Sequence, residues 1–388
     1  MKTLREEVAR ILPEAIEMRR YLHSHPELSG QEYQTRSYIC EKLASWSIPY
    51  RCCEKNTGVV ADIGQGSPCI ALRVDTDALP IQEQTGLPFA SQTPGVMHAC
   101  GHDVHTAVLL AAAKLLKDRE AGLKGSVRLL FQPAEETVGG AADMISEGCL
   151  EKPKVSAVFG FHVDPTQPAG YGAFFRGTMN AAATDMTLTV QGKGCHGAHP
   201  EQGVDAIVAA AQIVTALQSV VSRSIAPTAS GVVTVGTIAG GTKENIIADK
   251  VTMTGTIRAL EPQTQEQLKA AVRRVAENTA AAYGASVQVD MDDLCPALIN
   301  DGPLTDKLYA LAQELLGTDK ALQMRDPSLG ADDFAFFSNA VPGCYFNVGA
   351  YTEEIPGQAL HSPTFAPHEA ALETALLLMT AAAISSLE

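Results

Sequence analysis

The regular alternation of short apolar runs with helix-patterned segments, in the first half of the chain, constrains the fold more than any other feature. Mostly apolar runs occupy residues 58–63, 70–74, 126–131 and 157–161, and segments with helical spacing of apolar residues separate the later ones. Strands that read as continuous apolar runs are typical of parallel sheets whose crossover helices cover both faces. The sequence therefore predicts an α/β fold with a mostly parallel sheet flanked by helices.

Polar side chains follow three of these apolar runs. Asp75 and Asp77 follow the second run, Glu135 and Glu136 the third, and His162 the fourth. Open α/β sheets bind their ligands in a crevice at the carboxyl ends of the strands. We therefore expect these five side chains to meet in one site.

Residues 97–105 concentrate metal-binding side chains just before an alanine-rich run at 106–116, which is typical of a buried helix. The segment contains Cys100 and three histidines, and thiolate and imidazole are preferred ligands of borderline-soft divalent metals. A solvent-facing His-rich turn before a helix is the alternative. Cys100 as a nucleophile paired with histidine is another, but it leaves the paired glutamates and His162 without a role.

Adjacent Glu135 and Glu136 are, taken alone, typical of an acidic helix start. Together with the thiol and the imidazoles they fit a hydrolytic metal site. One carboxylate can bind the metal while its neighbour takes a proton from water, and a structural zinc site usually pairs its cysteines instead. The combined pattern favours metal-assisted hydrolysis.

Charge and missing motifs exclude several classes of function. A formal charge of −15 argues against nucleic acid or an anionic membrane as partner. No GxGxxG follows the first strand, and GxxxxGK[ST] and GxSxG are absent, so nucleotide cofactors and a serine elbow are not predicted. We expect a cytoplasmic protein for three reasons. The nine cysteines include no CxxC pair, and the N-terminus has no signal pattern. The longest apolar stretch, 375–384, is too short to span a membrane.

The pattern changes at residue 183. Alternating strands at 185–191 and 251–259, with the helices and strands around them, give the order β-α-β-β-α-β, which can stand as a domain of its own. Helix–strand alternation then resumes after residue 296. We expect a catalytic domain formed by residues 1–182 and 294–388, with a second domain at 183–293 inserted into it.

The ordered motifs resemble the co-catalytic metallopeptidase family of aminoacylase, carboxypeptidase G and hippurate hydrolase type. The most similar branch is that of N-acyl-amino-acid amidohydrolases and plant auxin-conjugate hydrolases. The resemblance covers nearly the whole chain and is carried by residues 20–29, 73–80, 97–106, 132–136, 160–163, 192–200, 255–258 and 361–365.

The resemblance implies two divalent metal ions, zinc or manganese, that share a water and a ligand. Glu135 matches the family's general base, and Asp77 matches an aspartate that orients a metal ligand. Asp75 stands where other branches have a metal-binding histidine, whereas His98 and His105 match motif positions that are not ligands. The metal ligands implied by the family pattern are Cys100, His102, Glu136, His162 and His361.

The inserted domain resembles the family's ferredoxin-like lid and dimerisation domain. His196 matches a residue that polarises the scissile carbonyl, in many members that of the partner subunit. Asn245 and Arg258 match residues that hold the substrate's free carboxylate; without the resemblance, Arg258 reads as a solvated charge on the polar face of a strand. Glu201 and Asp332 depart from the commoner family residues, and both departures concern specificity.

The function expected from the sequence is that of a homodimeric metal amidohydrolase. It would cleave N-acyl amino acids to the free amino acid and a carboxylate by metal-hydroxide attack, with Glu135 as general base. Within the enzyme class, a biosynthetic deacetylase of N-acetyl-diaminopimelate type or a dipeptidase is the alternative. From another class, the alternative is a catalytically inactive binding protein of the same fold.

Overall fold

The computed structural model describes residues 2–353 and 358–388. The chain divides into two compact units, the first formed by Met1–Gly177, Ile299–Asp326 and Asp333–Glu388, and the second by Thr178–Leu298 and Pro327–Asp332. The predicted boundaries at residues 183 and 293 fall inside the second unit, and the return of 327–332 to that unit has no counterpart in the prediction. Short strands β7 (Gly177–Asn180) and β14 (Leu298–Asn300) lie where the chain crosses between the units.

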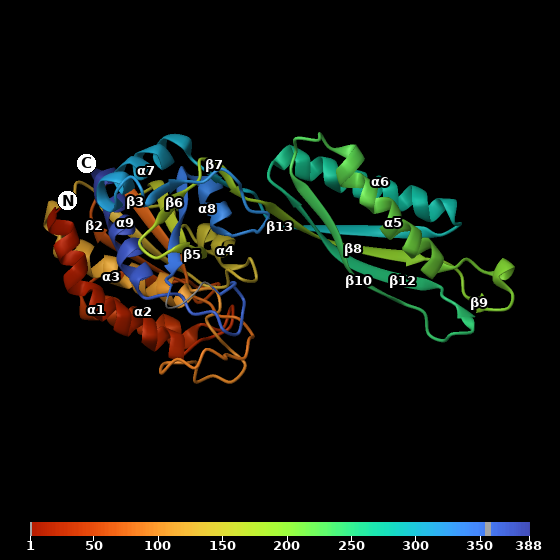
Figure 1. The fold of residues 1–388 in the computed structure, drawn as a ribbon, viewed down its shortest axis with the longest axis horizontal. Helices are drawn as coiled ribbons and strands as arrows, with labels where there is room; N and C mark the ends of the chain where they lie inside the picture. Colours follow the sequence, from red (N-terminus) through yellow and green to blue (C-terminus); the bar gives the residue numbers. More distant parts are fainter. Residues whose placement is uncertain (1, 354–357) are drawn as a thin grey trace. The chain divides into compact units, whose positions relative to one another are not determined.

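A large mixed sheet forms the centre of the first unit (Figure 1). Neighbouring strands β4, β3, β5 and β16 run parallel, whereas β1, β2 and β6 each pair antiparallel with a neighbour. The prediction of a mostly parallel sheet is therefore right for its centre. Among the described residues the sheet has eight strands, in the order β1 (Tyr50–Cys52), β2 (Val59–Gly64), β4 (Ser126–Gln132), β3 (Cys69–Asp75), β5 (Val155–Pro168), β16 (Gly343–Tyr351), β6 (Gly172–Phe174) and β15 (Ala321–Gln323).

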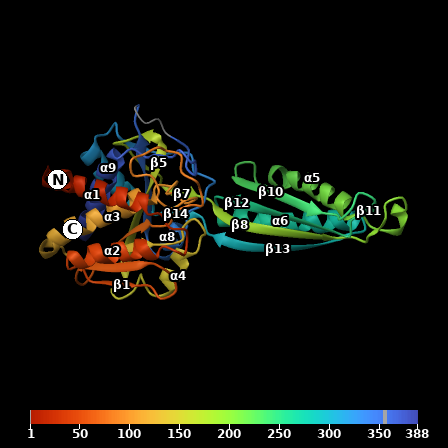
Figure 2. The same cartoon turned by 90° about the horizontal axis from the view of Figure 1, so that it is seen from below.

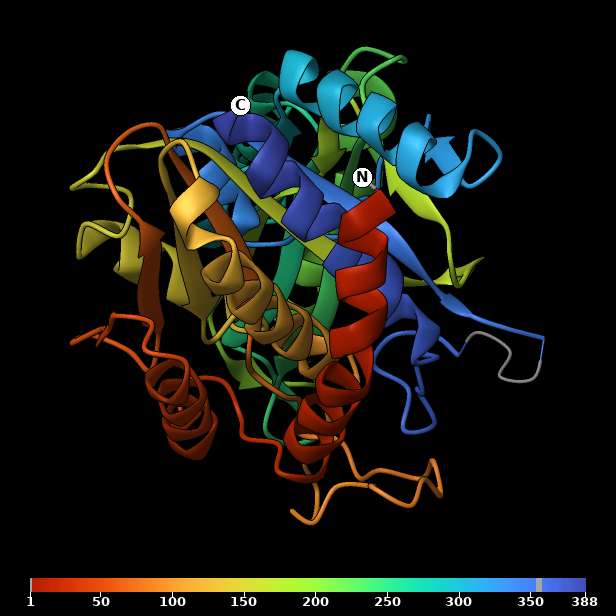
Figure 3. The same ribbon diagram turned by 90° about the vertical axis from the view of Figure 1, so that its left-hand side faces the viewer.

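Three long helices, α1 (Lys2–Ser24), α3 (His102–Asp118) and α9 (Ala370–Leu387), contact one another and cover one face of this sheet. Figure 3 shows them in front of the strands, in red, orange and dark blue. Helix α9 is apolar nearly all round because neighbours cover it on several sides, as expected for a core helix. The other helices of the unit are α2 (Tyr33–Ser45), α4 (Gly140–Ser146), α7 (Gly302–Leu316) and α8 (Phe334–Ala340).

Alternation along β5 shows that the opposite face is also covered. Phe159 and Phe161 belong to the core cluster formed with α1, α3 and α9, so Gly160 between them faces the other way. There Phe334 of α8 stacks on Tyr345, with ring centroids 4.7 Å apart. The first unit is thus a sheet between two helical layers, which buries its central strands on both faces.

The second unit packs two helices, α5 (Ala206–Ser224) and α6 (Pro262–Ala282), side by side on one sheet (Figures 1 and 2). Its elements follow one another as β8, α5, β10, β12, α6 and β13, with the short pair β9 (Cys195–His196) and β11 (Ile246–Ile247) as additions. Within the described part of the chain the sheet has four antiparallel strands, in the order β10 (Gly231–Gly240), β12 (Lys250–Ala259), β8 (Ala182–Gln191) and β13 (Ser286–Cys295).

Two of the described helices, α5 and α9, are long and apolar enough to cross a membrane by length and composition. Most of the α9 window is buried inside the first unit, and α5 packs on α6 and on the sheet of the second. Helix α9 therefore has the packing of a core helix, whereas α5 covers the sheet with one face and exposes the other.

Candidate metal centre

A glycine places the two donors of the 97–105 segment. Helix α3 begins at His102, four residues earlier than predicted, and Gly101 caps it with φ 88° in the left-handed region. A Cβ atom at residue 101 would lie 2.4 Å from Cγ2 of Val163, so only glycine allows this close approach. The tight turn sets Cys100 before the helix and His102 in its first turn, both buried.

The imidazole of His102 is held through one nitrogen and leaves the other free for a ligand. Its Nδ1 lies 2.9 Å from the carbonyl oxygen and 3.2 Å from Oδ1 of Asp77, so Nδ1–H donates to Asp77. Asp77 in turn accepts hydrogen bonds from Ser29 Oγ at 2.7 Å and from the backbone N of Glu136 at 3.1 Å. Burial opposes ionisation of Asp77, but the hydrogen bond and charge of His102, together with the hydrogen bonds from Ser29 and Glu136, outweigh it and lower the pKa of Asp77. Nε2 of His102 is buried without a hydrogen bond to any described residue.

His162 lies within β5 rather than beyond its end, because that strand continues to Pro168. Since Arg73 pairs with Gly160, His162 is nevertheless level with Asp75, the last residue of β3. Nδ1 of His162 donates to the carbonyl oxygen of Val163 at 2.7 Å. Its Nε2 therefore carries the lone pair, 3.4 Å from Sγ of Cys100.

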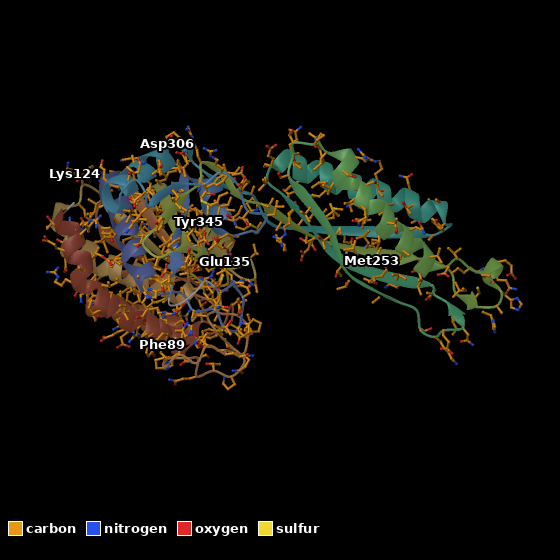
Figure 4. The ribbon with its side chains drawn as sticks, in the orientation of Figure 1. Phe89, Lys124, Glu135, Met253, Asp306 and Tyr345 are labelled. Carbon is orange, nitrogen blue, oxygen red and sulfur yellow. The ribbon has the colours of Figure 1, made fainter. Side chains whose placement is uncertain are left out.

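The paired glutamates follow β4 on a constrained turn. Ala134 has φ 55°, which is uncommon for a residue with a side chain, and its N–H donates to Oε1 of buried Glu32 at 2.9 Å. Glu135, labelled in Figure 4, follows directly. Oε1 of Glu136 lies 4.0 Å from Nε2 of His102.

His361 reaches the same place from a distant loop. Its backbone N–H donates to the carbonyl oxygen of Ala99 at 2.8 Å, which ties the loop to the segment that carries Cys100. Nε2 of His361 lies 3.3 Å from Oε1 of Glu136, and that contact raises the pKa of His361 despite partial burial. Of the five described donors, His361 alone is exposed, with 51% of its side chain accessible.

These donors form two sets that share one thiol. Among the described residues, the ligand atoms of Cys100, His102 and His162 lie within 4.8 Å of one another, and so do those of Cys100, Glu136 and His361. Burial raises the pKa of the Cys100 thiol well above its usual range, so a thiolate there needs a bound cation. The buried Nε2 of His102, which makes no hydrogen bond to a described residue, points to the same requirement. The residues present therefore fit two divalent metal ions, which the two sets would hold with Cys100 in common.

Asp75 and His105 lie beside these sets but are engaged elsewhere. Asp75 accepts from Arg73 at 2.9 Å and from Nδ1 of His105 at 2.5 Å, while Nε2 of His105 accepts from the N–H of Val163. Neither nitrogen of His105 is left for a metal. His98 is buried, and neither of its ring nitrogens makes a hydrogen bond to a described residue.

The three site residues of the second unit do not all lie together. The backbone N of Gly197 donates to the carbonyl oxygen of Asn245 at 2.8 Å, so His196 and Asn245 are neighbours near the β9–β11 pair. Arg258 pairs with Ala183 at the opposite end of β12 from Lys250. At roughly 3.4 Å per strand residue, eight residues separate these two ends of β12 by roughly 27 Å.

Sequence reasoning missed Ser29 and Glu32. The segment 29–32 reads as a helix start, and α2 does follow it at Tyr33. The side chains instead reach across the fold, Ser29 to Asp77 and Glu32 to Ala134. Both contacts span long sequence separations, so no local pattern carries the signal.

Comparison with known proteins places this geometry in a family. A family model described as Peptidase family M20/M25/M40 matches residues 71–385. The chain belongs to this family.

Relatives within peptidase family M20/M25/M40 are similar along most of their length. The chain is 40% identical over 381 residues to an N-acetylcysteine deacetylase of Bacillus subtilis, which covers 96% of this chain and 97% of that protein. It is 38% identical over 358 residues to an IAA-amino acid hydrolase of Arabidopsis thaliana, covering 91% and 81%. A solved structure of a dinuclear metal-binding peptidase from family M20 of Bacillus subtilis superposes with a TM-score of 0.85 at 36% identity, covering 98% and 99%. As an M20 protein, the chain is a hydrolase of amide bonds.

Proposed function

We propose that the chain is a dinuclear metal amidohydrolase that removes the acyl group from N-acyl amino acids. The observation that carries the proposal is the pair of donor sets sharing Cys100, with Glu135 directly before the donor Glu136. The names of two relatives, N-acetylcysteine deacetylase and IAA-amino acid hydrolase, both describe an acyl group joined to an amino acid. Zinc and manganese both suit this mixture of thiolate, imidazole and carboxylate.

The two cations, when bound, supply Lewis acidity: they polarise the substrate carbonyl and acidify a water. Glu135 takes the proton of the attacking water and passes it to the leaving amine. Its carboxylate lies within 4.8 Å of the ligand atoms of His102 and Glu136, which is the right neighbourhood for that transfer. Asp77 keeps the imidazole of His102 in the tautomer that offers Nε2.

In the second unit, His196 serves to stabilise the oxyanion, and Asn245 and Arg258 serve to hold the free carboxylate of the substrate. His196 and Asn245 are exposed, as groups that meet a substrate must be. Because Asn245 and Arg258 lie at opposite ends of β12, one copy of the chain cannot direct both at the same carboxylate. A second copy would supply one of them.

Exposed apolar side chains on the second unit support such a homodimer. They are Ile207, Val208, Ile238 and Ile246, which are 44–54% exposed. Strand β10, which carries Ile238, is an edge strand and so offers unpaired backbone groups. Pairing of two copies along β10 would cover both features. We place the enzyme in the cytoplasm, in keeping with its nine free cysteines.

A hydrolysis screen tests the proposal. Acetyl-, benzoyl- and long-chain-acyl amino acids are offered with manganese or zinc added, together with N-acetyl-diaminopimelate and dipeptides. We expect release of the free amino acid from at least one simple N-acyl amino acid. Turnover of only the diaminopimelate derivative or only dipeptides would replace the proposed substrate class. No turnover together with no bound metal would indicate a binding protein of the same fold.

The variant Glu135→Gln distinguishes the role of a general base from that of a metal ligand. We expect the variant to bind metal like the wild type and to lose about 10²–10⁴-fold in kcat, because an amide cannot accept the proton. Metal content is measured by elemental analysis and turnover with the best substrate of the screen. Glu151→Gln, at an exposed glutamate of the same unit, is the control. Near-wild-type turnover of Glu135→Gln would refute the role of Glu135 as base.

A further inference from the structure

His105 is a fully buried imidazole whose two nitrogens are both in use. The N–H of Val163 donates to Nε2 at 3.1 Å, and a peptide N–H can only donate, so Nε2 carries the lone pair. Nδ1 therefore carries the hydrogen and donates to Oδ1 of Asp75 at 2.5 Å. These two bonds fix both the tautomer and the plane of the ring.

Val163 connects His105 to a metal ligand. Its N–H donates to His105, and its carbonyl oxygen accepts from Nδ1 of His162 at 2.7 Å. Its side chain lies where a Cβ atom on Gly101 would clash at 2.4 Å, so it is packed against the turn between Cys100 and His102. The backbone of Val163 is thus held by His105 and in turn orients His162.

The other side of the ring is anchored in a buried charged network. Asp75 accepts from Arg73 at 2.9 Å, and Arg73 also donates to Asp333 and to Gln132, each at 2.7 Å. The side chains of Arg73, Asp75 and Asp333 are completely shielded from solvent. Each charged group of this buried network has more than one hydrogen-bond partner, so Asp75 is a stiff support for His105.

The ring of His105 also packs against the imidazoles of two donors, His162 and His102. The centroid of His105 lies 4.8 Å from that of His162, with the planes at 71°, and 5.4 Å from that of His102. A substitution of His105 therefore affects His162 first, because the two rings are in contact and the peptide of Val163 is hydrogen-bonded to both. Its effect on the set that contains His361 is indirect, because His105 is hydrogen-bonded to Asp75 and Val163 rather than to Glu136 or His361.

We propose that His105 is a positioning residue, which aims Nε2 of His162 at the metal by holding the peptide of Val163 against Asp75. The inference rests on the proposed role of His162 as a ligand. It predicts that loss of His105 weakens one of the two metal sites selectively, the one built from Cys100, His102 and His162. Removal of a partner that orients a ligand typically costs 10–100-fold in metal affinity.

The test compares His105→Leu with His105→Gln. Leucine leaves the N–H of Val163 and Oδ1 of Asp75 without the partner that His105 supplies, whereas glutamine can donate to Asp75 and accept from Val163. Metal-free protein is titrated with Mn²⁺ by calorimetry, and bound ions per chain are counted by elemental analysis. We expect His105→Leu to weaken one binding step about 10–100-fold and to leave the other within about threefold, and His105→Gln to restore most of the loss.

Controls separate positioning from folding. His98→Leu removes another buried imidazole of the same segment, one without hydrogen bonds to described residues, and we expect it to bind both ions as the wild type does. If metal-free His105→Leu does not fold, which circular dichroism shows, His105→Asn replaces it. Its side chain is too short to span Asp75 and Val163, so the same selective loss is expected.

Four outcomes would overturn the inference. Equal weakening of both steps, or no rescue by glutamine, would give His105 a merely structural role. Unchanged binding of two ions by His105→Leu and His105→Asn would remove the positioning role and leave the proposed function intact. Absence of Mn²⁺ and Zn²⁺ binding by the wild type would overturn the metal centre itself, and with it this inference.

Discussion

At the scale of single residues, buried ion pairs tie α1 to the segment that carries the metal donors. Nδ1 of His23 lies 2.9 Å from Asp103, and Nε2 lies 3.2 Å from Glu83. Arg19 contacts the same oxygen of Asp103 at 2.7 Å. Burial lowers the pKa of His23, but the charge and hydrogen bonds of Asp103 and Glu83 outweigh it, so the pKa is raised. Charged His23 thus bridges two carboxylates.

This pairing predicts a pH dependence of stability. A histidine whose folded-state pKa is raised stabilises the fold fully below the unfolded pKa of about 6.5, and the contribution is lost as pH rises through the folded pKa. We expect the unfolding temperature of chelator-treated wild type to fall relative to His23→Gln as pH is raised from about 6 to about 9. His25→Gln, whose ring bonds to Ser24 and Tyr21 instead, is the control. A constant difference between wild type and His23→Gln across this range would contradict the assignment.

Residue type alone could identify the donors as candidates but could not show how they are used. Cys100 and Glu136 are possible ligands by their chemistry, and the implied five donors do converge in the structure. Whether Nδ1 or Nε2 of an imidazole is free depends on partners far away in the sequence, such as Asp77 for His102. The roles of these residues in binding and catalysis stay predictions.

At the scale of elements, the contact of β5 with α8 leaves no room for a side chain at Gly160. A Cβ atom there would lie 2.8 Å from both Phe334 and Tyr345, whose rings are buried and stacked. The absence of a side chain lets α8 lie flat on the sheet. Helix α8 begins one residue after Asp333, which binds Arg73, so this packing also supports the network under Asp75.

Gly160→Ala is therefore expected to destabilise the first unit by about 1–3 kcal/mol, because two aromatic rings must shift to admit a methyl group. Urea unfolding followed by circular dichroism gives the change in free energy of unfolding. Gly122→Ala is the matched control, since a Cβ atom there meets nothing within 4 Å. Equal stability of the two variants would show that α8 can move away from the sheet at little cost.

The long elements could be read from periodicity, and the short ones could not. The pattern gave β3 and α9 within a few residues, because their apolar runs are long enough to stand out. Strands β1, β6 and β15 have three residues each, and their pairing depends on neighbours distant in sequence. The pattern also ended β5 too early, since the polar residues after Phe161 continue the strand beside β16.

At the scale of the whole molecule, the proposed dimer predicts complementation between two inactive variants. Glu135→Gln removes the proposed base of the first unit, and His196→Ala removes the proposed oxyanion donor of the second unit. If His196 acts on the partner's site, a hybrid dimer has one site with both residues intact. Coexpression of the two variants should then restore about a quarter of wild-type activity, since half of the dimers are hybrids with one good site each.

A second pair of variants serves as the control for complementation. Coexpression of Glu135→Gln with Glu136→Gln serves as control, because every site in that mixture carries a defect in the first unit. Light scattering of the wild type gives the mass in solution. Restoration no greater in the first mixture than in the control would place His196 in its own subunit's site or outside catalysis.

The change of periodicity at residue 183 was enough to predict a second compact unit, because alternating strands differ visibly from buried parallel ones. It could not predict that 327–332 returns to that unit, since six residues without periodicity carry no signal of the unit they pack with. The oligomeric state is harder still to predict, because the sequence of an edge strand such as β10 is the same whether or not a partner subunit covers it.

The sequence distance between donors orders events during synthesis. Cys100, His102 and His162 have all been synthesised when less than half of the chain is made, whereas the set with Glu136 and His361 lacks a residue until near the end of translation. Strand β16 and helix α9, which complete the core around β5, also arrive last. If the two sets hold metal ions as proposed, an incomplete chain offers the residues of only one set, and binding of a second ion requires a residue from the C-terminal quarter.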